Sequence, residues 1–135
     1  MAQIFLIYSD WGILLLRLVL GLIFLVHGWS KIKDLKANAK DFDSMGFRPG
    51  FFWGTIVALV EFFGAIFLIL GLYTSIVAIL IAINMTVATL WKIKKGQLLV
   101  SGYELDLILA VSALLLATLA GGMYSLDSYW HIRFF

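Results

Sequence analysis

Residues 51–72 read FFWGTIVALVEFFGAIFLILGL, and one carboxylate, Glu61, lies at the centre of this apolar run. The length of the run matches the ~20 apolar residues that a helix needs to cross a bilayer. A charged carboxylate near mid-bilayer costs at least ~2.5–3.5 kcal/mol, so we expect Glu61 to face other helices and to have a partner there. Helical spacing gives the Glu61 face mainly small residues: Gly54, Ala58, Gly64 or Ala65, and Leu68. Small residues let a neighbouring backbone come close, so this face is predicted to pack inside a bundle.

The composition is that of an integral membrane protein. Of the 135 residues, 63% are hydrophobic and 13% are charged, against about 45–50% and about 25% in soluble domains. We therefore interpret residues 1–135 as a single transmembrane domain. The sequence has no cysteine, which excludes disulfides, thiol catalysis, and iron–sulfur or zinc sites with cysteine ligands.

Three more apolar runs accompany residues 51–72. Together they predict transmembrane helices over residues 11–29, 51–72, 75–91 and 98–120, and hence an all-α bundle of four helices. Residues 30–45 differ because their apolar positions recur near helical spacing while four lysines occupy other faces. This pattern is typical of a short amphipathic helix lying on the membrane surface.

The basic residues predict the orientation of the bundle. Arg17 lies within the first predicted helix, and Arg133 is near the C-terminus. The other basic residues fall in the first and third loops: Lys31, Lys33, Lys36, Lys40, Arg48, Lys92, Lys94 and Lys95. The positive-inside rule puts these two loops in the cytoplasm and both termini outside, in a multi-pass protein of the cytoplasmic (inner) membrane.

Polar residues within the four predicted helices suggest a buried site. Counted from the inner helix ends at ~1.5 Å per residue, Arg17 lies ~18 Å deep, Glu61 ~15 Å, and both Asn84 and Asp106 ~10–12 Å. We expect these four residues to form one polar core, with His27 and Glu104 nearer its rim. Acids this close in a poor dielectric cannot all be ionised, so a proton is expected to be shared unless Lys31 or His27 reaches in. Such a site suits proton-coupled redox chemistry or proton transport.

A structural interpretation of the same residues stays open. An Arg17–Glu61 pair can fix the register of two helices, with Asn84 and Asp106 completing its hydrogen bonds. His27 alone is more typical of an interfacial residue than of a ligand, and His131 is predicted on the other side of the membrane. Haem ligation by two histidines of one chain is therefore not expected, and no metal site is predicted.

Five segments of the chain resemble the DoxX family of small four-helix membrane proteins. They read RLVLGLIFLVHGWSKI (17–32), GFRPGFFWGTIVALVEFFGAIFLILGLYT (46–74), AINM (82–85), GYELDL (102–107) and YSLD (124–127). The positions that match include Arg17, Glu61, Glu104 and Asp106. The resemblance implies the four-helix fold, and relatives of the family include a subunit of thiosulfate:quinone oxidoreductase. Thiosulfate chemistry itself has no counterpart in these residues, and no cysteine is present to carry sulfur.

These observations favour a membrane subunit of a quinone-linked oxidoreductase system. A quinone would bind against Arg17 and Asn84, with His27 and Glu104 as further ligand-binding residues, while Glu61 and Asp106 pass protons as catalytic residues. No motif for a flavin, a nicotinamide, a covalent cofactor or a metal is present, so electrons would come from a partner subunit or a soluble reductant.

Two alternatives are an assembly or anchoring subunit that docks a partner through residues 30–45, and a binder or carrier of a small lipophilic solute. The expected partners are the lipid bilayer, an oxidoreductase subunit or a second copy of the chain, and no nucleic acid.

Overall fold

The computed structural model of the chain describes residues 2–132 and is helical throughout, with no strand in that range. The elements are α1 (Ala2–Ile7), α2 (Ser9–Ile32), α3 (Leu35–Ser44), α4 (Gly50–Leu70), α5 (Thr74–Lys94), η1 (Leu99–Tyr103), α6 (Glu104–Leu119) and α7 (Leu126–Tyr129). Within residues 2–132, four helical segments are long and apolar enough to cross a membrane: α2, α4, α5, and η1 with α6. Arg133, which entered the orientation argument, lies outside the described residues.

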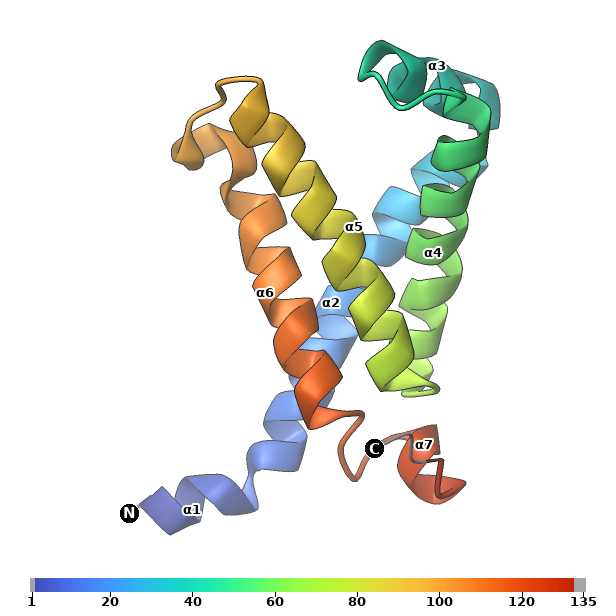
Figure 1. The fold of residues 1–135 in the computed structure, drawn as a ribbon. Helices are drawn as coiled ribbons and strands as arrows, with labels where there is room; N and C mark the ends of the chain where they lie inside the picture. Colours follow the sequence, from blue (N-terminus) through green and yellow to red (C-terminus); the bar gives the residue numbers. More distant parts are fainter. Residues whose placement is uncertain (1, 133–135) are drawn as a thin grey trace.

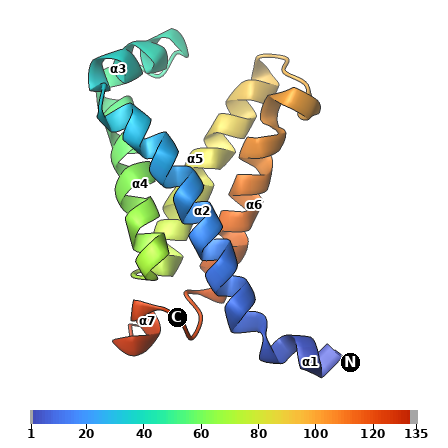
Figure 2. The ribbon, with the colours of Figure 1, turned by 180° about the vertical axis from the view of Figure 1, so that it is seen from behind.

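The long helices form two antiparallel pairs, α2 with α4 and α5 with α6. The pairs meet near α1 and α7 and separate toward α3, so that the bundle has the outline of a V (Figure 1). The view from behind shows α2 running diagonally across this face of the bundle, from α3 at one end to α1 at the other (Figure 2). We call the end that holds α1 and α7 the terminal end. The end that holds α3 and the α5–α6 connection is the lysine-rich end.

Glycine residues set the close packing of α2 against α4. A Cβ atom at Gly28 would clash with the backbone of Phe62 and Glu61, and one at Gly21 would lie 3.2 Å from the carbonyl oxygen of Ala65. The small residues predicted on the Glu61 face are buried, among them Ala58 and Ala65. Without a hydrophobic driving force between helices in lipid, such close contact is the main source of helix association.

The core is a narrow strip of side chains between the two pairs. It includes Leu20, Phe24, Leu68, Ile81, Ala113 and Leu116. The outward faces carry large apolar residues that are exposed, such as Val26, Phe63, Ile83 and Leu114. Exposure of so many apolar side chains is what a bundle surrounded by lipid requires.

Within the segment predicted to be an amphipathic helix, residues 30–45, α2 continues to Ile32 and a separate helix, α3, folds back onto the start of α4. The Asp34 side chain caps it by accepting a hydrogen bond of 3.0 Å from the Ala37 backbone N–H. On its buried side, the Asn38 amide donates to the carbonyl oxygen of Gly54 over 2.8 Å. A Cβ atom at Gly50 would have no room beside α3. The first two turns of α4 are therefore covered by α3, and the last turns of α2 pack against α4 further along, where Gly28 meets Glu61 and Phe62.

The fourth spanning segment differs from the predicted helix 98–120. Val100 has an extended backbone (φ −74°, ψ 130°) and Ser101 has a positive φ of 61°. The regular helix α6 begins only at Glu104, whose carboxylate accepts a hydrogen bond of 3.1 Å from the Ser101 N–H. Residues 98–103 thus form a turn, which brings Asp106 into the first turn of α6.

Candidate functional site

Glu61 is buried between the two helix pairs and has a partner on each side. Its side chain is 1% exposed, and its Oε2 lies 2.6 Å from Nζ of Lys31 on α2. Its Oε1 accepts a hydrogen bond of 3.0 Å from the side-chain amide of Asn84 on α5. We call these three residues the Glu61 site. The prediction that the Glu61 carboxylate is buried and partnered is confirmed, and Asn84 is one of the partners expected.

The local sequence explains why Lys31 reaches Glu61. Gly28 lets the backbone of α2 touch α4 at Glu61 and Phe62, and Lys31 lies three residues further along the same face of α2. The Lys31 side chain remains 27% exposed. The Glu61 carboxylate of this ion pair is therefore buried within the bundle, while the Lys31 side chain reaches the surface at the lysine-rich end.

Arg17 lies far from Glu61, and the predicted match in level between the two residues is wrong. Lys31 is fourteen positions after Arg17 in one continuous helix, which corresponds to ~21 Å. Arg17 instead lies beside Gly71, the residue that follows the end of α4 and is ten positions beyond Glu61. Depths counted from the helix ends agree only if the helices end at one level, whereas the first turns of α4 lie against α3.

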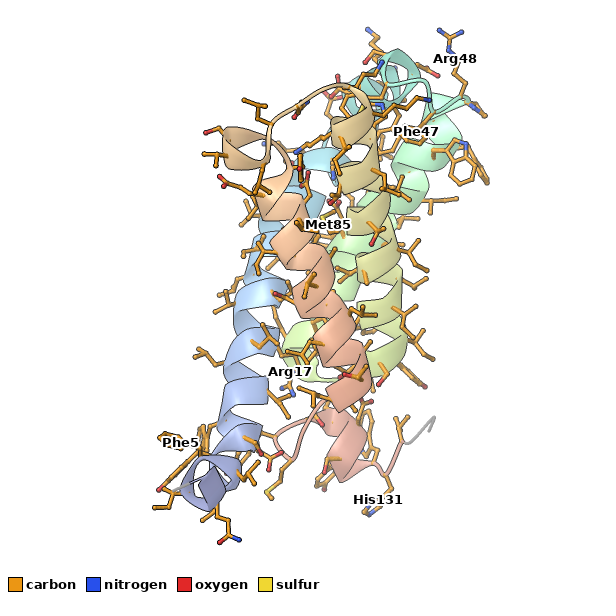
Figure 3. All side chains as sticks on the ribbon, turned by 60° about the vertical axis from the view of Figure 1, so that its left-hand side comes forward. Phe5, Arg17, Phe47, Arg48, Met85 and His131 are labelled. Carbon is orange, nitrogen blue, oxygen red and sulfur yellow. The ribbon has the colours of Figure 1, made fainter. Side chains whose placement is uncertain are left out.

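The Arg17 guanidinium belongs to a structural cluster at the terminal end. It is 2% exposed, and it donates to the carbonyl oxygens of Gly121 (2.5 Å) and Tyr124 (2.7 Å). Figure 3 shows Arg17 between α2 and the C-terminal segment, well away from Phe47 at the other end. A Cβ atom at Gly71 would clash with this guanidinium. Arg17 therefore holds the C-terminal segment against the end of the bundle.

Asp127 completes this cluster and was not identified as a polar site residue from the sequence. Its two carboxylate oxygens accept hydrogen bonds from the backbone N–H groups of Tyr73 (2.6 Å) and Thr74 (2.8 Å). The first N–H groups of a helix have no acceptor within the helix itself, so Asp127 acts as the cap of α5. Asp127 is part of the YSLD segment that resembles the DoxX family. A helix cap supplied from more than fifty residues away, however, leaves no local sequence pattern that would reveal it.

Asp106 also lies outside the Glu61 site. It forms an ion pair of 2.5 Å with Lys92 on α5, and both side chains are partly exposed. Lys92 is eight positions beyond Asn84, or ~12 Å along α5. The predicted single core is thus three separate clusters, and the predicted surplus of acids around one arginine does not arise. Each of the two acids has its own lysine instead.

The remaining two predicted ligand residues are at the surface. His27 is exposed on α2, and Glu104 is exposed at the start of α6, where it caps the Ser101 N–H. The structure brings neither to the Glu61 site. Among residues 2–132, no group of three His, Asp or Glu side chains could hold a metal ion.

Two surface grooves border the bundle. One, of about 460 Å³, runs along α4 and α5 and is lined by apolar side chains that include Val60, Gly64, Val77 and Leu80. The other, of about 420 Å³, lies at the lysine-rich end between α5 and the α3–α4 connection. Neither of these two grooves is lined by a described residue of the Glu61 site. The lining of the α4–α5 groove includes Val60, the sequence neighbour of Glu61, and Leu80, one turn before Asn84 on α5.

The fold and this site define a multi-pass helical membrane protein with a buried carboxylate. The sequence model of the DoxX family, described simply as DoxX, matches residues 12–93. The chain belongs to the DoxX family. The matched region contains the Glu61 site and Arg17, and it ends before Asp106 and Asp127.

A curated relative covers most of the chain. It is named "Putative oxidoreductase CatD", comes from Bacillus subtilis (strain 168), and is 30% identical over 118 residues, which are 87% of this chain and 86% of the relative. No solved structure matches the chain.

Proposed function

We propose that this chain is a membrane subunit of a quinone-linked oxidoreductase system and that the Glu61 site transfers protons in it. The observation that carries the proposal is the buried Glu61 carboxylate paired with a partly exposed lysine. An ionisable residue within a membrane-spanning helix is costly and commonly marks a proton or substrate path. The name of the Bacillus relative supports the oxidoreductase class.

The α4–α5 groove fits the substrate that this proposal requires. It is apolar, about 460 Å³ in volume, and lies on faces of α4 and α5 that also carry exposed apolar residues. A quinone could enter it directly from lipid, with its head group toward Glu61 and Asn84 and its apolar tail toward Tyr73. Reduction of a quinone to a quinol takes two electrons and two protons. The electrons would come from a partner subunit or a soluble reductant.

In this proposal each polar residue has a distinct task. The Lys31 ammonium group passes a proton to the Glu61 carboxylate, which hands it on toward the groove, and Lys31, which reaches the surface, then regains a proton from water. The Asn84 amide holds the carboxylate in place. Asp106 and Lys92 form a second, partly exposed ion pair at the lysine-rich end, which can take up from water the second proton that quinone reduction requires. Arg17 has a structural task and does not touch the substrate.

We place the lysine-rich end in the cytoplasm and the terminal end outside, in the cytoplasmic membrane. The support is the distribution of basic residues along the chain, since lysine and arginine are enriched in cytoplasmic loops. Protons used at the Glu61 site would then come from the cytoplasm.

One observation favours a second candidate, a non-enzymatic assembly or anchoring subunit. Both carboxylate oxygens of Glu61 already have partners within the protein. A carboxylate satisfied in this way can serve as a link between the two helix pairs without any substrate. In that case α3, with its exposed lysines, would be the surface that docks a partner.

The two candidates differ in what the purified protein carries. The full chain is purified in mild detergent, and ubiquinones and menaquinones are quantified by mass spectrometry in wild type, Glu61→Gln and the matched control Asp41→Asn. Asp41 is exposed on α3, so its substitution removes a carboxylate elsewhere. We expect a quinone enriched over the membrane lipid pool in wild type and control, and depleted in Glu61→Gln. A wild-type protein with no quinone enrichment would overturn the proposal in favour of the assembly subunit.

A further inference from the structure

The groove at the lysine-rich end is separate from the Glu61 site and has its own chemistry. Its volume is about 420 Å³, and it lies between α5 and the connection from α3 to α4. Its lining comprises Met45, Gly46, Phe47, Val87, Leu90, Trp91, Lys94 and Lys95. Figure 3 shows Phe47 at this end of the molecule.

Hydrogen bonding fixes the shape of this groove. The indole N–H of Trp91 donates to the carbonyl oxygen of Met45 over 3.0 Å, which ties α5 to the α3–α4 connection. Gly46 has a positive φ of 93°, a conformation that glycine adopts without strain and that turns the chain along the groove wall. The two walls are thus held together by a bond across 46 residues of sequence.

The lining is divided along its length into an apolar part and a cationic part. Val87 and Leu90 are exposed on the outward face of α5, where a membrane-spanning helix faces lipid. Lys94 and Lys95 follow at the end of the helix and are exposed. Within residues 2–132 neither lysine has an ion-pair partner, and the Lys95 ammonium group lies 5.7 Å from the centre of the Trp91 ring. Among the residues that the structure describes, no carboxylate lines the groove.

We propose that this groove binds one anionic glycerophospholipid. Its phosphate would lie between Lys94 and Lys95, and one acyl chain would run along Val87 and Leu90 toward the middle of the bilayer. Charge complementarity selects this occupant, because the groove lining ends in two cations that form no ion pair within residues 2–132 and that follow an apolar wall facing lipid. The inference does not depend on the proposed quinone chemistry.

Native mass spectrometry on the delipidated full chain tests the proposal. The probes are phosphatidylglycerol and phosphatidylcholine with identical acyl chains. We expect wild type to prefer phosphatidylglycerol and expect the double variant Lys94→Gln/Lys95→Gln to lose about fivefold in affinity for each lysine. The control Lys33→Gln/Lys36→Gln removes two exposed charges at the same end but outside the groove, and it should change the affinity less than twofold.

A third variant distinguishes binding of the lipid within the groove from attraction to the surface lysines alone. Val87→Trp fills the acyl path and leaves both lysines in place, and it should lower phosphatidylglycerol binding severalfold while the helical content stays unchanged by circular dichroism. Wild type without a preference for phosphatidylglycerol, equal losses in the two lysine pairs, or full binding by Val87→Trp would each overturn the proposal.

Discussion

Lys31 and Glu61 form an ion pair of 2.6 Å in which the carboxylate is buried and the ammonium group is partly exposed. The pair joins α2 to α4, and the Asn84 amide extends the connection to α5. A buried carboxylate is tolerated only when its oxygens have partners, so Glu61 depends on Lys31 for its place between the helices. The cation that pairs with Glu61 is therefore Lys31 and not Arg17. The first two predictions test this assignment.

Replacing Lys31 with methionine should destabilise the protein by about 1–3 kcal/mol, because it leaves a buried carboxylate without its cation. The double variant Lys31→Met/Glu61→Gln should recover much of that loss, since a neutral amide needs no counter-charge. Thermal unfolding in detergent, followed by circular dichroism, measures both. Lys33→Met, at an exposed lysine two positions away, is the control. If the double variant is no more stable than Lys31→Met, the ion pair is not what holds the site.

Arg17→Lys should lower stability by about 1–3 kcal/mol without depleting quinone from the folded protein. A lysine cannot reproduce the fork by which the guanidinium contacts two carbonyl oxygens at once. Because Arg17 is ~21 Å from Lys31 along α2, the Glu61 site should be unaffected. The check combines thermal unfolding with quinone content per folded protein. Quinone loss in Arg17→Lys that matches the loss in Glu61→Gln would contradict the separation of the two clusters.

Arg17 and Glu61 also show which features of the site can be predicted from the sequence and which cannot. The four spans follow from apolar length, and burial of Glu61 follows from the cost of a charge in lipid together with the glycines and alanines on its face. The identity of the cation that pairs with Glu61 does not follow from these features of the sequence. Depth counted along separate helices assumes that they end at one level, and here α3 covers the first turns of α4.

Contacts between distant parts of the chain could likewise not be predicted from the sequence. Asp106 was predicted in the polar core, and helical periodicity alone could not reveal that α6 begins at Glu104, which places Asp106 in the first turn of that helix. Asp127 caps α5 from the other end of the chain, with no spacing rule to indicate it. Both cases depend on where one helix ends against another, which tertiary packing decides.

Asp127→Ala should weaken the terminal end by about 1–2 kcal/mol, because the first N–H groups of α5 lose their acceptors. Hydrogen–deuterium exchange is the direct measurement, and we expect faster exchange at Tyr73 and Thr74 and in residues 121–129. Asp41→Ala, at an exposed position of α3, is the matched control. Unchanged exchange at the start of α5 would show that the cap contributes nothing to the stability of this end.

Gly28→Ala tests whether the approach of α2 to α4 creates the Glu61 site. The added methyl group would clash with the backbone of Phe62 and Glu61, so the two helices would have to move apart. We expect a loss of about 1–3 kcal/mol from overpacking and a smaller cost for subsequently replacing Lys31 with methionine. Gly12→Ala is the control, because its Cβ would have nothing within 4 Å. A full Lys31→Met penalty in the Gly28→Ala background would mean that the ion pair forms independently of the glycine contact, and Gly28 would then serve packing alone.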